Sequence, residues 1–256
     1  MRFAMILAID IGNSNIVMGG YAHGALSFET RLSTDRSLEA DQYALELAGI
    51  LKLYGVAREG IERAIISSVV PRVTAAIARA VKIFSGVDAM FLSKENADVA
   101  IHIDNPAELG NDILATAVIV KERYALPAIV IDMGTATTIT AIGKDGDVEG
   151  VSIFPGLFIS LDALTARSSQ LGGIAIEPPR TAIGKNTACS MQSGLVFGTA
   201  AMLDGMLARF EAELGAPCTC VATGGAAGMI VPHCTHKVAY APTLLLDGLH
   251  AVAARA

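Results

Sequence analysis

The stretch LAIDIGNSNIVMGG, residues 7–20, decides the fold because a similar stretch, AIVIDMGTATTITAI, returns at residues 128–142. Both stretches share one frame: an apolar run, an aspartate, one apolar residue, a glycine, small polar residues and a second apolar run. The aspartates are Asp10 and Asp132, and nearly half of the 256-residue chain separates them. The repetition indicates either a duplicated unit or a site built from two halves.

Each of these stretches predicts two strands joined by a tight glycine turn. The first pair is expected at residues 5–11 and 16–20, the second at residues 128–133 and 137–143. Elsewhere, apolar residues at helical spacing predict helices and β-branched runs predict strands. We expect strands at 64–71 and 218–223, a loop at 150–156, and helices at 38–55, 71–84, 113–124, 157–169, 188–214 and 244–254. This alternation indicates an α/β fold, with expected lobes at residues 1–124 and 125–256.

Composition restricts the class of partner. The net charge is −6 and the Lys and Arg residues form no cluster, so the positive surface of a nucleic-acid-binding protein is missing. Hydrophobic residues make up 52% of the chain, yet no apolar run approaches the roughly 18 residues of a membrane span. We therefore expect a small-molecule partner, no nucleic acid and no membrane, with the apolar residues used in a buried sheet and a subunit interface.

The first residues and the cysteines indicate the compartment. Asp10 ends the N-terminal apolar run early, so residues 1–10 predict a first strand rather than a signal peptide. The Cys and His spacings between residues 218 and 236 fit no common zinc pattern. The cysteines are unevenly spaced, which favours reduced thiols in a cytoplasmic protein: Cys189, Cys218, Cys220 and Cys234.

The two aspartate turns have the chemistry of a phosphate site. Glycine has no Cβ and tolerates positive φ, so backbone N–H groups in such a turn can approach an anion closely. An aspartate at the strand end can hold a cation that neutralises phosphate oxygens. A third segment, ATGGAAG at residues 222–228, allows a base or ribose to lie against its backbone. Taken singly, each segment is equally typical of an ordinary turn.

The ordered set of segments resembles the acetate and sugar kinase, Hsc70 and actin superfamily, and in detail is similar to the type III pantothenate kinases. The similar segments are DIGNSN, SSVVP, NPAELGND, DMGTATT, PGLFISLDAL, IGKNTACSMQSG and TGG, at residues 10–15, 67–71, 105–112, 132–138, 155–164, 183–194 and 223–225. The resemblance implies a two-lobed, actin-like (ribonuclease H-like) duplicated fold with mixed sheets flanked by helices. It also implies a homodimer whose acceptor site lies where the subunits meet.

The implied activity is ATP-dependent phosphorylation of the pantothenate hydroxyl to 4'-phosphopantothenate, the first step of coenzyme A biosynthesis. The resemblance assigns Mg²⁺ to Asp10 and a monovalent cation, K⁺ or NH₄⁺, to Asp132. Ser14 stands where the family usually has threonine, which keeps the hydroxyl. The implied ATP-binding residues are Asp10, Gly12, Asn13, Ser14, Asn15, Gly134, Thr135, Gly224 and Gly225.

On the acceptor side the resemblance makes Asp112 the catalytic base. It precedes the helix expected at 113–124, where a carboxylate can cap N–H groups and remain ionised, so a simple N-cap is an equal alternative from spacing alone. The implied substrate-binding residues are Gly110, Asn111, Asp112, Ile113 and Thr187.

Two positions depart from the family pattern. Ile113 stands where an arginine normally follows the aspartate, and Ile103 stands where a tyrosine is common. A guanidinium can bind a carboxylate through two hydrogen bonds and isoleucine cannot. The alternatives are therefore a kinase of the same fold for another small alcohol, or a nucleotide-binding regulator without catalysis. The presence of Asp10, Asp112, Asp132 and Thr187 favours the pantothenate kinase.

Overall fold

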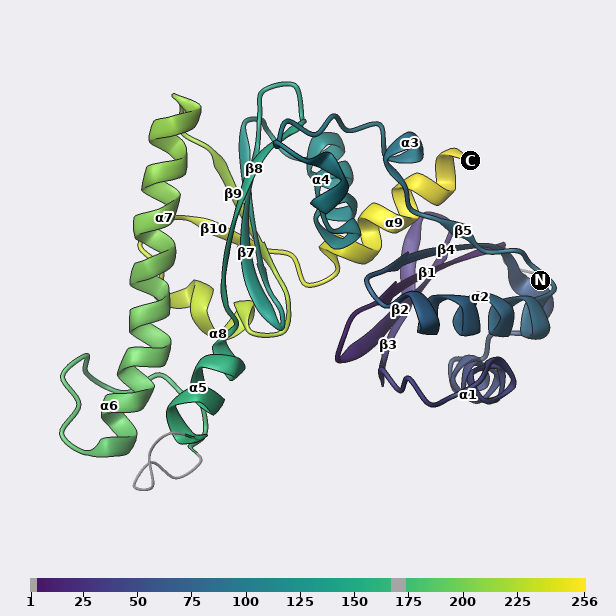
Figure 1. Cartoon of the computed structure of the whole chain (residues 1–256), viewed down its shortest axis with the longest axis horizontal. Coiled ribbons are helices and arrows are strands. Elements are labelled where there is room, and N and C mark those ends of the chain that lie inside the picture. Colours follow the sequence, from purple (N-terminus) through teal and green to yellow (C-terminus); the bar gives the residue numbers. More distant parts are fainter. Residues whose placement is uncertain (1–3, 167–173) are drawn as a thin grey trace. The chain divides into compact units, whose positions relative to one another are not determined.

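The computed structural model describes residues 4–166 and 174–256 and divides the chain into two compact units (Figure 1). Unit 1 comprises Met1–Ala100, Asn105–Ile119 and Leu244–Ala256; unit 2 comprises Ile101–Asp104 and Val120–Thr243. These units differ from the expected lobes, residues 1–124 and 125–256, chiefly because the closing helix belongs to unit 1. This helix, α9 (Leu244–Arg255), contacts strands of the first sheet.

Unit 1 is built on a five-stranded sheet of order β3-β2-β1-β4-β5. Strand β1 pairs antiparallel with β2 and parallel with β4, so it is the central strand. The strands are β1 (Met5–Ile11), β2 (Asn15–Ala22), β3 (Ala25–Ser33), β4 (Ile61–Ser68) and β5 (Met90–Phe91). Its other elements are α1 (Ala40–Leu53), η1 (Arg58–Gly60), α2 (Pro71–Ser85), α3 (Lys94–Ala97), η2 (Pro106–Glu108) and most of α4 (Asn111–Arg123).

Unit 2 repeats this topology. Its sheet has the order β8-β7-β6-β9-β10, with β6 antiparallel to β7 and parallel to β9. The strands are β6 (Ala128–Met133), β7 (Ala136–Ile142), β8 (Val148–Pro155), β9 (Thr219–Thr223) and β10 (Val238–Tyr240). The helices are α5 (Leu157–Ala166), α6 (Thr187–Ser193), η3 (Gly194–Gly198), α7 (Thr199–Leu214), α8 (Ala227–Ile230) and η4 (Val231–His233).

Burial of the central strands explains these elements. Residues 128–131 of β6 are all buried, as expected for a strand covered on both faces. In unit 1, α1 and α2 pack against one another, and their apolar residues form a core with those of β1 (Figure 1). Helix α2 begins with Pro71 and is followed by Gly86 at φ 79°, the residues suited to those two positions. The helices thus follow the apolar periodicity of the sequence, and the central strand β6 follows a continuous run of apolar residues that become buried.

Several expected elements are confirmed and some are wrong. The helix expected at 188–214 is present as α6, a π-helical turn and α7 in succession. The loop expected at 150–156 is wrong, because most of that segment belongs to β8, which pairs with β7 as a third antiparallel strand. Strand β3 occupies the same place in unit 1 and was not expected. The helix expected at 157–169 is described as far as Ala166, and its last residues lie outside the described residues.

No helix within the described ranges combines the length and apolar character needed to cross a membrane.

Helix α9 packs closely on α4 at a glycine. A Cβ at Gly248 would overlap the carbonyl oxygen of Ala115 and lie 2.7 Å from its carbonyl carbon. We expect Gly248→Ala to lower the free energy of unfolding by about 1–3 kcal/mol, because the helices must separate. Urea denaturation followed by circular dichroism measures this.

The matched control is Gly205→Ala in α7, where an added Cβ would meet no described atom within 4 Å apart from its chain neighbours and the backbone of its own helix. Alanine loses less conformational entropy than glycine in a helix, so we expect a gain of about 0.5–1 kcal/mol. A Gly248→Ala protein as stable as the wild type would contradict the close packing of α9 on α4.

Candidate nucleotide and acceptor site

The first glycine turn joins β1 to β2 and is held from a third strand. Within the turn, the Gly12 N–H donates to the Asn15 carbonyl at 2.9 Å. Thr34, directly after β3, donates its N–H to the Ser14 carbonyl at 3.0 Å and its hydroxyl to the Gly12 carbonyl at 2.7 Å. Thr34 therefore donates hydrogen bonds to two carbonyl groups of the turn. The conformation of the turn thus depends on the end of β3 as well as on the residues of the turn.

Asp10 lies at the end of β1 beside the first turn. It pairs in register with Ser67 of the parallel strand β4, and the Ser67 hydroxyl donates to Asp10 Oδ1 at 2.9 Å. Ser67 is buried, whereas Asp10 is partly exposed. A buried hydroxyl that donates to one carboxylate oxygen orients the group at the strand end. The segment SSVVP, noted in the sequence as the end of an expected strand and as part of a resemblance, thus supports Asp10 through Ser67.

The second turn joins β6 to β7 and lies against the late glycine pair, all within unit 2. Asp132 pairs in register with Thr138 of β7 and with Thr223 of β9. Gly224 follows with φ +91°, and a Cβ there would lie 2.6 Å from both Asp132 Oδ1 and the Met133 backbone. The structure therefore brings Asp132 and the TGG segment together, as a shared site requires.

Two further residues of unit 2 complete this turn. A Cβ at Gly156 would overlap the Thr135 carbonyl oxygen and lie 2.6 Å from that of Gly134. The Ala226 N–H donates to the Met133 carbonyl at 3.2 Å. Backbone from the end of β8 and from the segment after β9 thus approaches the turn closely, and at Gly156 and Gly224 a side chain larger than hydrogen would overlap it.

Asp112 lies in the first turn of α4, which corrects the expectation that it precedes the helix. The helix begins at Asn111, and the Gly110 carbonyl accepts the Leu114 N–H at 3.2 Å, so Gly110 holds the capping position. Asp112 Oδ1 accepts the Ile113 N–H at 2.8 Å. A carboxylate at this place faces the positive end of the helix dipole. Ile113, in contrast, is buried.

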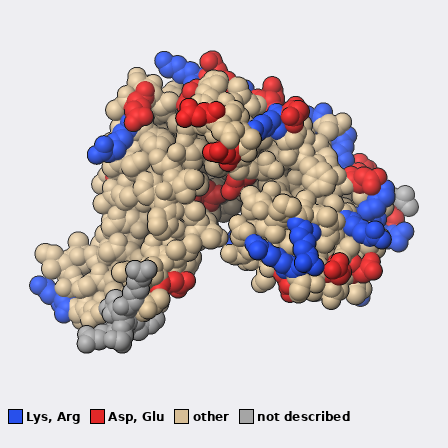
Figure 2. Space-filling model, in the orientation of Figure 1, with Lys and Arg blue, Asp and Glu red and all other residues tan. Residues whose placement is uncertain are grey.

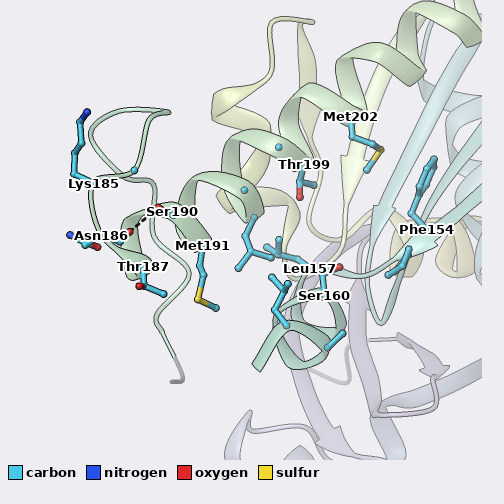
Figure 3. Close-up of a pocket in the computed structure, with 17 residues that line it drawn as sticks. Phe154, Leu157, Ser160, Lys185, Asn186, Thr187, Ser190, Met191, Thr199 and Met202 are labelled. Carbon is cyan, nitrogen blue, oxygen red and sulfur yellow. Dashed lines mark hydrogen bonds between the residues drawn. The ribbon is translucent and has the colours of Figure 1, made fainter. Parts of the chain in front are cut away.

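Thr187 lines a pocket of about 1110 Å³ in unit 2. It is the first residue of α6, whose cap is Asn186: the Asn186 side chain accepts the Cys189 N–H at 2.9 Å. Figure 3 shows Met191 and Leu157 on the inner side of this pocket and Lys185 at its outer end, directed away from them. The pocket is mainly apolar, with the Thr187 hydroxyl among its few polar groups.

The cysteines near the C-terminus are packed within unit 2, and His236 there contacts a carboxylate. Burial raises the pKa of Cys220 to about 12 and that of Cys234 to about 11, so both thiols are protonated near neutral pH. All four cysteines are free. Among the described residues, no group of three or more His, Cys, Asp and Glu residues is placed to hold a metal ion. His236 is instead held by Asp204 of α7, with Nδ1 and Oδ1 3.0 Å apart.

The predicted residues are divided between the units. Unit 1 carries the first turn and the segment around Asp112; unit 2 carries the second turn, the glycine pair and Thr187. Within each unit, partners remote in sequence support the predicted residues. Those that sequence reasoning did not assign a role are Thr34, Ser67 and Gly156, and only Ser67 and Gly156 fell within segments noted for a resemblance.

Comparison with known proteins gives the family. The family model of the type III pantothenate kinases matches residues 6–209. The chain belongs to the type III pantothenate kinase family. It is 38% identical to a type III pantothenate kinase from Moorella thermoacetica over 251 residues, covering 97% of this chain and 98% of that protein. The family resemblance expected from the sequence motifs is thereby confirmed.

Solved structures confirm the fold. A Baf family transcriptional activator from Campylobacter jejuni aligns with a TM-score of 0.62 at 18% identity, covering 96% of each chain. The (R)-2-hydroxyglutaryl-CoA dehydratase component A from Acidaminococcus fermentans aligns with a TM-score of 0.55 at 14% identity, covering 98% of this chain and 97% of that one. At these identities the likeness shows the fold alone. The expected actin-like α/β fold with two mixed sheets is confirmed.

Gly224 tests the packing of the glycine pair on the second turn. Gly224→Ala would place a Cβ against Asp132 and Met133 in a backbone conformation that favours glycine, and we expect a loss of about 2–4 kcal/mol in the free energy of unfolding. Thermal denaturation measures this. Gly228→Ala is the control, because its Cβ would make an ordinary 3.4 Å contact with the Tyr240 ring. Equal melting temperatures for the two variants would contradict the close approach.

Proposed function

We propose that the protein is an ATP-dependent kinase that converts pantothenate to 4'-phosphopantothenate, the first step of coenzyme A biosynthesis, in the cytoplasm. Family membership supports this proposal and implies ATP as co-substrate and a divalent metal. The observation that carries it is the position of Asp112, a partly exposed carboxylate in the first turn of α4. A carboxylate held at that place can accept the proton of an alcohol.

The nucleotide side uses both glycine turns. Backbone N–H groups of Asn13, Ser14 and Asn15 would bind phosphate oxygens in unit 1, beside Gly12, whose own N–H is used within the turn and which lets the phosphate approach closely. Those of Gly134 and Thr135 would bind phosphate oxygens in unit 2. Gly224 and Gly225 would accommodate the nucleoside. Close backbone approach is what such turns provide to an anion.

The cations would lie at the two aspartates. Asp10 fits Mg²⁺, because its carboxylate lies at a strand end, is partly exposed and is oriented by Ser67. Asp132 has a similar place beside Gly224 and fits a monovalent cation, K⁺ or NH₄⁺. When bound, these cations neutralise charge on the ATP phosphates.

At the acceptor, Asp112 would receive the proton of the pantothenate hydroxyl as its oxygen forms a bond to the γ-phosphorus of ATP. The bond from that phosphorus to the bridging oxygen breaks, and ADP leaves. Positioning contributes most to phosphoryl transfer, so Asp112 would act mainly by orienting the hydroxyl. Gly110, Asn111 and Thr187 would complete the acceptor site.

The departures at Ile113 and Ile103 do not favour a different function. Ile113 is buried, so its side chain belongs to the packing of α4. Close relatives over nearly the full length are named type III pantothenate kinase. We therefore infer that the site binds pantothenate without the arginine, and that another small alcohol or a purely regulatory role is disfavoured.

We further propose that the protein is a homodimer formed through the end of unit 2 that carries α5 and α6. Large apolar side chains are exposed there, and Ile153, Phe158 and Ile183 are 71%, 52% and 73% exposed. On the face shown in Figure 2 this end of unit 2 carries few charged residues. Exposed apolar surface of this kind is typical of a protein interface.

The role of Asp112 is tested by Asp112→Asn. We expect pantothenate-dependent ADP release with MgATP and K⁺ to fall about 10²–10⁴-fold, because a neutral amide neither takes up the proton nor orients the hydroxyl as an anionic acceptor does. Asp41→Asn is the control: Asp41 is an exposed carboxylate in the first turn of α1, and we expect its loss to leave turnover unchanged. Full activity of Asp112→Asn would rule out the proposed base, and an inactive wild type would rule out the kinase.

The dimer is tested by Ile183→Asp. A carboxylate within an apolar interface loses hydration, so we expect static light scattering to give a dimer for the wild type and a monomer for the variant. Leu53→Asp places the same charge at an 84% exposed residue of α1 and should remain dimeric. A monomeric wild type, or a dimeric Ile183→Asp protein, would contradict this interface.

A further inference from the structure

We propose that Arg36 is a phosphate-binding residue at the first glycine turn; this inference rests on the ATP binding proposed above. Arg36 follows β3 and lies in an exposed segment before α1. Its Nη2 donates to Asn13 Oδ1 at 3.0 Å, so the guanidinium lies directly beside the turn. No role was assigned to this arginine from the sequence, because it lies 23 positions after Asn13, with two strands between them.

The segment that carries Arg36 is held in place on both sides. Before it, Thr34 makes two hydrogen bonds to the first turn. The Tyr43 hydroxyl, on a fully buried side chain of α1, donates to the Asp35 carbonyl at 2.6 Å and accepts the Asp35 N–H at 3.2 Å. After it, both the N–H and the hydroxyl of Ser37 donate to Asp35 Oδ1, at 2.8 and 2.6 Å.

These bonds fix the backbone on either side of one exposed residue. The hydrogen bonds from Ser37 lower the pKa of Asp35, so its carboxylate stays ionised and turned toward Ser37. A segment anchored by β3 and by the buried Tyr43 presents Arg36 to the turn with little freedom of its backbone. Less conformational entropy is then lost when the guanidinium binds a ligand.

The contact with Asn13 leaves donors for an anion. Asn13 Oδ1 accepts from Arg36, so the Asn13 amide keeps its two N–H groups as donors. A guanidinium has five N–H donors and one is used here. Among the described residues, Arg36 forms no ion pair with a carboxylate within 4.0 Å, whereas the Arg72 guanidinium of α2 is 3.8 Å from the Glu39 carboxylate. The available chemistry is that of a phosphate-binding arginine, which recognises phosphate oxygens through paired N–H groups.

The ligand class that follows is a nucleoside polyphosphate bound through its phosphates. Arg36 lies beside the turn that would bind the phosphates, so it is expected to distinguish ATP from adenosine rather than one base from another. It is a positioning and binding residue, because a fixed positive charge at the phosphates orients them without exchanging a proton.

The test is isothermal titration of MgATP, and separately of adenosine, into the wild type and four variants. We expect Arg36→Ala to weaken MgATP binding about 10- to 100-fold, the range for hydrogen bonds to a charged group, and to leave adenosine binding unchanged. Arg36→Gln can keep a hydrogen bond to Asn13 without the charge and should fail to restore affinity, whereas Arg36→Lys should restore part of it. Arg79→Ala, an exposed arginine of α2, is the control.

The outcomes separate this inference from the function on which it rests. If the wild type binds MgATP and Arg36→Ala binds it equally well, Arg36 has no role at the phosphates. If Arg36→Gln binds MgATP like the wild type, the residue acts only by orienting Asn13, and the inference is overturned. If the wild type binds no MgATP, the nucleotide site itself is wrong and this inference fails with it. Melting temperatures of the variants confirm that each one is folded.

Discussion

Both sheets depend on one constraint: the central strand is buried and hydrogen-bonded on both edges, so it can carry a charged group only where it ends. β1 and β6 each lie between an antiparallel and a parallel neighbour. An ionised carboxylate within either strand would lose its hydration without compensation. Asp10 and Asp132 are both partly exposed at these strand ends. The candidate cation-binding carboxylate of each unit therefore lies at the end of its central strand, at the edge of the hydrophobic core.

The duplication extends to the groups that support each turn. In unit 1, Thr34 follows the third antiparallel strand and Ser67 lies in the parallel neighbour of β1. In unit 2, Gly156 follows the third antiparallel strand and Gly224 follows the parallel neighbour of β6. The supports come from corresponding strands, although Gly224 lies one residue beyond Thr223, the register partner of Asp132. They differ in kind, since hydroxyl groups of Thr34 and Ser67 donate hydrogen bonds in unit 1, whereas unit 2 uses close backbone approach at glycines. The same topology has thus produced two sites of different chemistry.

The nucleotide and acceptor sides differ in how much they depend on side chains. In the proposed site the turns would present backbone N–H groups, so Ser14 in place of threonine would change little. The proposed acceptor side would depend on particular side chains, Asp112 and Thr187 among them, and there the departures at Ile113 and Ile103 would remove groups that no backbone can replace.

The sequence by itself determined the repeated strand-turn-strand frame, the α/β class and most helices, because apolar periodicity and glycine turns are local properties of the chain. It also determined the family, since Asp10, Asp112 and Asp132 occur in order within recognisable segments. Only the tertiary structure decided that β3 and β8 complete each sheet, that α9 packs in unit 1, and that Ser67 and Arg36 lie beside the first turn. Such contacts join residues far apart in the chain. They depend on the order and register of the strands, which a local sequence pattern does not specify.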